Sequence, residues 1–180
     1  LLEIRQQQAS LLSKAAALLA NQAPGGYRLL TSLDDAFPKR LNSIADAPVL
    51  LFTKGQANLN TQRTIGIVGT RSATSYGRSI TKKIIEDLLP YQPTIVSGLA
   101  YGIDIEAHRV ALQLGLPTLA VMGSPIHLIY PAAHKGTASQ LVEAHGALLS
   151  EYAPGSILLP GNFPARNRII AAISDALLVV

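Results

Sequence analysis

The sequence of 180 residues contains no cysteine. This absence excludes a disulfide scaffold and any zinc or iron–sulfur site that depends on thiolate ligands. It also fits a reducing compartment, so we expect a cytoplasmic protein. His127, His134 and His145 lack the helical spacing of metal ligands, and we therefore expect neither a metal site nor a cofactor.

Charged residues are scarce, at 14% of the chain, against 48% apolar residues. This balance indicates a folded domain with a buried core and argues against a disordered chain. One long uncharged stretch, residues 110–134, contains Pro117, Pro125 and Pro131. We therefore expect no membrane-spanning helix and no membrane partner. The net charge of +4 favours an anionic partner without identifying it.

Apolar residues recur at helical spacing between Leu1 and Asn21, ahead of a Pro-Gly-Gly breaker. This pattern predicts a short amphipathic helix, which we interpret as the remnant of a preceding helical module. The pattern over residues 27–60 is mixed, with a short helical stretch at 37–44 and a strand at 49–52. We therefore expect an N-terminal segment over residues 1–60 and the main domain over residues 61–180.

From Thr64 onward, short apolar runs rich in β-branched residues alternate with stretches of helical length. The expected strands are 65–68, 94–96, 118–122, 147–149 and 176–180. The expected helices are 76–89, 103–114, 137–145 and 164–173, and residues 128–131 are expected to form a loop. This alternation predicts an α/β fold with a parallel sheet and helices on both faces.

Small and polar residues follow the first two expected strands. Gly69, Thr70, Arg71 and Ser72 come after the first strand, and Ser97 and Gly98 come after the second. The carboxyl ends of parallel strands meet at the edge where ligands bind, and backbone N–H groups approach an anion there. Arg71 adds a guanidinium fork suited to phosphate, so this edge predicts an anion-binding site. The alternative is that the glycines only make tight turns and that Arg71 pairs with a surface acid.

A second cluster of candidate residues precedes the last expected strand. It brings together two arginines, two amides and an aromatic ring, namely Arg166, Arg168, Asn162, Asn167 and Phe163. Cations at the start of a helix disfavour the helix unless an anion lies there, so the arginines also point to phosphate. The ring offers a face on which a base can stack. The alternatives are a core role for Phe163 and a solvated role for the arginines.

Several enzyme classes find no support. The first glycine loop lacks the G-x-G-x-x-G spacing of dinucleotide-binding enzymes, and no P-loop motif occurs. Asp104 and His108 share a helical face and with Ser97 would supply the residues of a catalytic triad, but Ser97 is not in a G-x-S-x-G turn. We therefore favour structural roles for Asp104 and His108.

These residues resemble the DNA-processing protein A family of bacteria, DprA, also called Smf. The resemblance covers residues 36–180 and rests on these strings in order: FPKRLNSIADAPVLLFTKG, IGIVGTRSATSYG, VSGLAYGIDIEAH, IYP, GALLSEYAPG and NFPARNRIIAAIS. The sequence departs from the usual family pattern at Pro125, His127 and His134, where glycine, an acid and asparagine are common, so the third loop is expected to differ in shape.

The resemblance implies a Rossmann-like domain that binds and protects incoming single-stranded DNA and helps load the recombinase RecA during natural transformation. It implies a binding protein with no catalytic reaction, and a homodimer in the full-length protein. On this basis residues 61–180 are a DNA-binding domain that is incomplete at its C-terminal end. The implied DNA and phosphate site comprises Gly69, Thr70, Arg71, Ser72, Ser97, Gly98, Asn162, Phe163, Arg166, Asn167 and Arg168.

Two alternatives use the same pocket. The first is a hydrolase acting on nucleotides or nucleoside phosphates, which would need Asp104 or Glu151 as its carboxylate. The second is a module that senses a small phosphorylated nucleotide without converting it.

Overall fold

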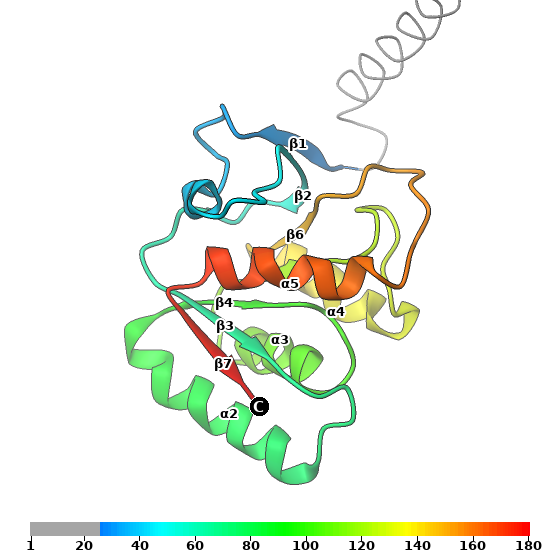
Figure 1. The fold of residues 1–180 in the computed structure, drawn as a ribbon. Helices are drawn as coiled ribbons and strands as arrows, with labels where there is room; N and C mark the ends of the chain where they lie inside the picture. The colour runs from blue at the N-terminus through cyan, green and yellow to red at the C-terminus, as the bar shows by residue number, and fades with distance from the viewer. Residues whose placement is uncertain (1–25) are drawn as a thin grey trace, which may run out of the picture.

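The computed structural model describes residues 26–180, which form a sheet with helices on both of its faces (Figure 1). The helix predicted over residues 1–21 lies outside the described residues. The four helices of the described range are α2 (Ser75–Leu88), α3 (Ile103–Gln113), α4 (Lys135–Glu143) and α5 (Asn162–Ile173). Each lies within two residues of its predicted bounds. Three short 3-10 helices in this range are η1 (Lys39–Ser43), η2 (Leu89–Tyr91) and η3 (Ala132–His134).

The sheet has seven strands in the order β1-β2-β6-β5-β4-β3-β7. Their bounds are β1 (Arg28–Thr31), β2 (Leu50–Gly55), β3 (Thr64–Val68), β4 (Thr94–Ser97), β5 (Thr118–Val121), β6 (Ala147–Ser150) and β7 (Ala176–Val179). The strands from β6 to β7 are parallel, which confirms the predicted α/β fold with its parallel sheet. The two other strands, β1 and β2, extend the sheet in antiparallel register beside β6.

Strand β1 was not predicted from the sequence. Its four residues carry one β-branched side chain, Thr31, so the local signal for a strand is weak. The segment becomes a strand because β2 supplies the pairing partner, with Leu29 opposite Phe52 and Leu30 opposite Leu51. Residues 28–55, within the predicted N-terminal segment, therefore contribute two strands to the common sheet.

Consecutive side chains of the central strands pack against helices on opposite faces of the sheet. In β4, Ile95 packs in the cluster beneath α2 and α3, while Val96 packs beneath α5. In β5, Ala120 packs in the cluster that includes α4 residues, and Leu119 faces α5. Consecutive side chains of a strand point to opposite faces, so continuous apolar runs are suited to a sheet buried on both sides. Figure 1 shows α5 on one face and α2 and α3 on the other.

The chain reverses its direction of travel across the sheet at β3. From β3 it moves outward through β4, β5 and β6, and then α5 returns it to β7 on the other side of β3. In open α/β sheets, ligands bind beyond the carboxyl ends of the strands where such a reversal occurs. We therefore expect a ligand site beside the ends of β3 and β7, at Val68 and Val179.

Among the helices described, none combines the length and the apolar character that a bilayer crossing requires.

Candidate functional site

A pocket lies at the point where the strand order reverses. Its volume is about 340 Å³. Its walls come from the ends of β3 and β7, the loop after β4 and the first turns of α5. We call it the strand-end pocket, and it is lined by Val68, Gly69, Thr70, Arg71, Ala100, Asp104, Phe163, Pro164, Arg166, Asn167, Val179 and Val180.

Six residues of the predicted phosphate site meet in this pocket: Gly69, Thr70, Arg71, Phe163, Arg166 and Asn167. Two segments more than 90 residues apart in the sequence are thus brought together, because α5 crosses back over the sheet to β3. The five other predicted residues, Ser72, Ser97, Gly98, Asn162 and Arg168, do not line it, and Gly98 lines the neighbouring hollow described below.

Close backbone packing shapes the first loop of the pocket. The Thr70 N–H donates to the Val180 carbonyl at 3.3 Å, and the Ile103 N–H donates to the Thr70 carbonyl at 3.2 Å. A Cβ at Gly69 would overlap the Val180 carbonyl oxygen and the Ile103 side chain, so only glycine fits there. Ser72 is exposed, and its N–H donates to the Thr70 hydroxyl at 3.2 Å.

Arg71 projects from this loop and is exposed. Its guanidinium carbon lies 5.8 Å from the centre of the Phe163 ring, within the range of a cation–π contact. Within the described part of the chain, Arg71 has no acidic partner, in contrast to Arg166 and Arg168. A cation and a half-buried aromatic ring therefore stand side by side at the mouth of the pocket.

A second hollow adjoins the first and shares Arg71, Ala100 and Phe163 with it. Its volume is about 180 Å³, and it is also lined by Gly98, Tyr101, Tyr130 and Pro131. We call it the aromatic pocket. The Tyr130 and Phe163 rings have their centres 5.3 Å apart, and the Tyr101 and His134 rings pack edge to face with their centres 4.9 Å apart. Tyr130 was not among the predicted site residues, although it lies in the IYP string of the family resemblance.

Arg166 lines the strand-end pocket from below, with only 4% of its side chain exposed. Its Nη1 donates to the carbonyl oxygens of Gly98, at 2.6 Å, and Val121. Its Nε donates to the Asn167 Oδ1 at 3.2 Å. The guanidinium thus joins the ends of β4 and β5 to the start of α5.

Asp104 faces the same guanidinium, with 4.0 Å between its Oδ2 and the Arg166 Nη2. Burial raises the pKa of Asp104, although Arg166 and the N–H groups of Ala100, Gly69 and Gly98 act to lower it. Burial likewise lowers the pKa of Arg166, against the opposing effect of Asp104. Both pKa shifts favour the uncharged form of the group. This agrees with the 4.0 Å between the two charged groups, because attraction at that distance offsets only part of the cost of burying them.

Ser97, Asp104 and His108 do not form a triad. The Ser97 hydroxyl donates to the Ile67 carbonyl at 2.6 Å, and the His108 Nδ1 lies 2.7 Å from the Thr118 Oγ1. The Thr118 hydroxyl donates its own hydrogen to the Ile95 carbonyl, so it accepts in the contact with His108. We therefore assign the ring proton of His108 to Nδ1. Burial is the main cause that lowers the pKa of His108 to about 3, followed by the charges of Arg166 and His134. His108 is therefore neutral at physiological pH.

Arg168 and Asn162 lie away from the pocket. The Arg168 guanidinium pairs with Glu151 at 2.7 Å and with Asp46 at 2.9 Å, and Asn162 is buried. Residues two apart on a helix do not share a face, which explains why Arg166 and Arg168 point to different partners. The predicted phosphate contact of Arg168 stays a prediction, and it would require this guanidinium to exchange Glu151 for phosphate.

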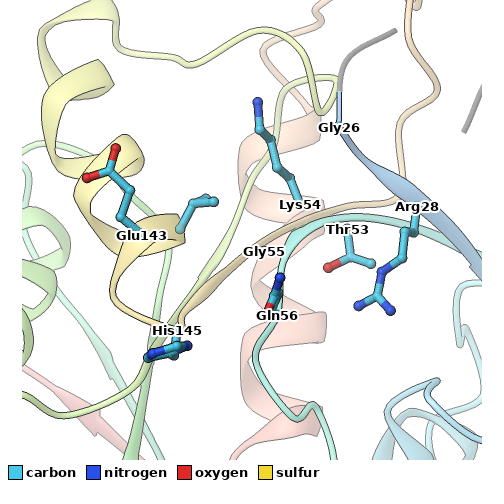
Figure 2. A pocket seen from close by; sticks show the side chains of 9 residues that line it. Gly26, Arg28, Thr53, Lys54, Gly55, Gln56, Glu143 and His145 are labelled. Atoms are coloured by element: carbon cyan, nitrogen blue, oxygen red, sulfur yellow. The ribbon is translucent and has the colours of Figure 1, made fainter. Parts of the chain in front are cut away.

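A larger hollow, of about 750 Å³, lies at the opposite end of the sheet. Figure 2 shows Arg28, Thr53 and Lys54 on its strand side and Glu143 and His145 on its helix side. Its lining carries charges of both signs and none of the predicted site residues. Residues 26–180 also contain no cluster of three or more His, Asp or Glu side chains arranged to hold a metal ion.

Comparison with known proteins finds relatives described as DNA processing proteins. The chain is 44% identical over 147 residues to the DNA processing protein DprA of Streptococcus pneumoniae, covering 82% of this chain and 51% of the relative. It is 36% identical over 154 residues to the protein Smf of Escherichia coli, covering 86% of this chain and 41% of the relative. The chain thus spans about half the length of the curated relatives it matches.

Two solved structures share the fold. The X-ray structure of DNA processing protein A from S. pneumoniae matches with a TM-score of 0.78 and 42% identity, over 85% of this chain and 53% of that one. DNA processing protein A from Helicobacter pylori, solved for insight into its single-stranded DNA binding mode, matches with a TM-score of 0.74 and 31% identity, over 85% and 68%. The family model described as DNA recombination-mediator protein A matches residues 28–180. The chain belongs to the DNA recombination-mediator protein A family.

Proposed function

We propose that this chain binds single-stranded DNA at the strand-end pocket and the aromatic pocket. The observation that carries the proposal is the pairing of Arg71 with Phe163 where the two pockets join. A phosphate needs a cation and backbone N–H donors, and an unpaired base needs an aromatic face. The single-stranded DNA binding of the H. pylori relative supports the same ligand.

In the proposed complex, different residues of the two pockets contact the phosphates and the bases. Arg71 holds phosphate on the loop that Gly69 and Thr70 shape, while Phe163 and the neighbouring tyrosines accept bases by stacking. Nothing in residues 26–180 resembles a base-reading helix, so we expect binding to be largely independent of sequence. For the complete protein, we propose that bound DNA is protected and passed to RecA, that the protein acts as a homodimer, and that it binds without catalysing a reaction.

Arg71→Ala tests the proposal most directly. We expect weaker binding of a fluorescein-labelled oligothymidylate, measured by anisotropy across a salt series. Loss of one phosphate contact should also lower the slope of log affinity against log salt by about 0.7. Arg28→Ala is the matched control, because Arg28 is exposed and lies at the opposite end of the sheet. Equal effects of both variants, or preference for duplex DNA, would refute the proposed site.

Competition separates DNA binding from the two nucleotide alternatives. A thymidine monophosphate should compete poorly with the oligonucleotide, because one nucleotide fills only part of the joined pockets. Equal competition would favour a nucleotide-sensing module. Release of base or phosphate from nucleoside monophosphates, abolished in Asp104→Asn, would favour the hydrolase.

A further inference from the structure

Most of the buried guanidinium of Arg166 is engaged inside the protein. Nη1 donates hydrogen bonds to the Gly98 and Val121 carbonyls, and Nε donates to the Asn167 side chain. Nη2 faces Asp104. With 4% of its side chain exposed, it offers a phosphate little surface. A direct DNA contact through Nη1 or Nε would break one of these hydrogen bonds and leave a buried polar group unsatisfied. Only Nη2, which faces the Asp104 carboxylate, makes no hydrogen bond among the described residues.

Asp104, the acidic partner of Arg166, also lies against the pocket loops. The N–H groups of Ala100, Gly69 and Gly98 all act on its carboxylate, and these residues follow β4 and β3. A Cβ at Gly98 would overlap both the Arg166 guanidinium and the Asp104 carboxylate, so the loop backbone lies directly on the pair. The pair therefore lies directly against the backbone of the loop after β4.

We propose that Arg166 and Asp104 are positioning residues that hold the DNA-binding loops in place from beneath and do not contact DNA themselves. Arg166 fixes Gly98 through its carbonyl and turns the Asn167 amide so that its NH₂ group is left for the pocket. Asp104 lies against the Gly98 backbone beside the same guanidinium. This assignment rests on the proposed single-stranded DNA site and assigns Arg166 a different role from the phosphate contact predicted from the sequence.

Arg166→Lys separates positioning from direct contact. Lysine keeps the positive charge, but its single ammonium cannot serve two carbonyls and the Asn167 side chain in the geometry of the planar guanidinium. If Arg166 acts by positioning, the lysine variant should bind oligothymidylate about 10- to 100-fold more weakly, as when groups that orient binding residues are removed elsewhere. Its salt slope should match the wild type, because no phosphate contact is lost. Retained affinity, or a slope lowered as in Arg71→Ala, would overturn the proposal.

Asp104→Asn provides a readout that needs no DNA. Loss of the carboxylate charge should shift the ¹H–¹⁵N signals of Gly69, Gly98 and Ala100 more than those of the distant glycines Gly115 and Gly136. An unfolded variant is recognised by collapsed amide dispersion. The wild-type chain then supplies the decisive measurement: on adding oligothymidylate, the Nε–H signal of Arg71 should move and that of Arg166 should stay. Comparable movement of both signals would refute positioning by Arg166.

The outcomes also distinguish this inference from the proposed function. A wild-type chain that fails to bind oligothymidylate refutes the DNA site, whereas the amide shifts in Asp104→Asn still report whether the pair organises the loops. Binding that depends on Arg71 but not on Arg166 would leave the proposed function standing and remove the positioning role.

Discussion

Arg168 and Glu151 form a two-pronged ion pair, with Nη1 3.1 Å from Oε1 and Nη2 2.7 Å from Oε2. Glu151 directly follows β6, so the pair ties the end of that strand to α5. Paired hydrogen bonds between guanidinium and carboxylate are stronger than single contacts, but part of the pair is reached by solvent.

We therefore expect Arg168→Ala to lower the free energy of unfolding by about 1 kcal/mol, measured by urea denaturation. Its affinity for oligothymidylate should fall far less than that of Arg71→Ala, because Arg168 lies outside both pockets. A loss of affinity equal to that of Arg71→Ala would show that Arg168 leaves Glu151 to bind phosphate, as predicted from the sequence.

Phe163 should contribute to binding through its ring and not through a charge. Phe163→Ala is expected to weaken oligothymidylate binding by about 1–3 kcal/mol, the usual range for one stacked base, with an unchanged salt slope. Phe163→Tyr keeps the ring and is the control, with affinity expected near that of the wild type. If Phe163→Leu binds as well as Phe163→Tyr, apolar bulk is sufficient and stacking is refuted.

His108 should make the protein less stable in acid. Its pKa falls from the ordinary 6.5 to about 3 in the folded protein, mainly because the ring is buried. Between these values the unfolded chain binds a proton that the folded chain does not, so the free energy of unfolding decreases as pH falls from about 6.5 to about 3. The contribution of this residue approaches about 1 kcal/mol per pH unit.

Urea denaturation at several pH values checks this dependence. His108→Gln should show a shallower decline than the wild type over that window. Parallel declines in the wild type and His108→Gln would contradict the assignment.

Gly102 should be far less tolerant of substitution than Gly115, although both have positive φ angles, of 79° and 70°. A Cβ at Gly102 would overlap the Thr70 carbonyl oxygen and the Arg71 backbone, whereas a Cβ at Gly115 meets no atom within 4 Å. Gly115→Ala should therefore carry only backbone strain, about 1 kcal/mol. Gly102→Ala should be destabilised further and should lose oligothymidylate affinity, since it would push the two loops apart. Equal stability and affinity of the two variants would contradict this.

Local patterns were sufficient to predict much of the fold. The parallel strands and the four described helices lie close to their predicted bounds because each follows from hydrophobic periodicity and turn residues within a short window. The gathering of Gly69, Arg71 and Phe163 was also predictable, because parallel strands share one carboxyl edge. Strand β1 was not, since its pairing with β2 and not its own composition makes it a strand.

The roles of the three arginines depended on distant contacts. From the sequence alone, Arg71, Arg166 and Arg168 are equivalent cations near the ends of strands. The tertiary structure gives Arg166 the carbonyls of Gly98 and Val121, and it gives Arg168 the carboxylate of Glu151. A side chain's partners depend on what folds against its helix face, and that is determined by the return of α5 across the sheet. The sequence by itself determined the elements and the edge where the site lies, and the tertiary packing decided which cation faces outward.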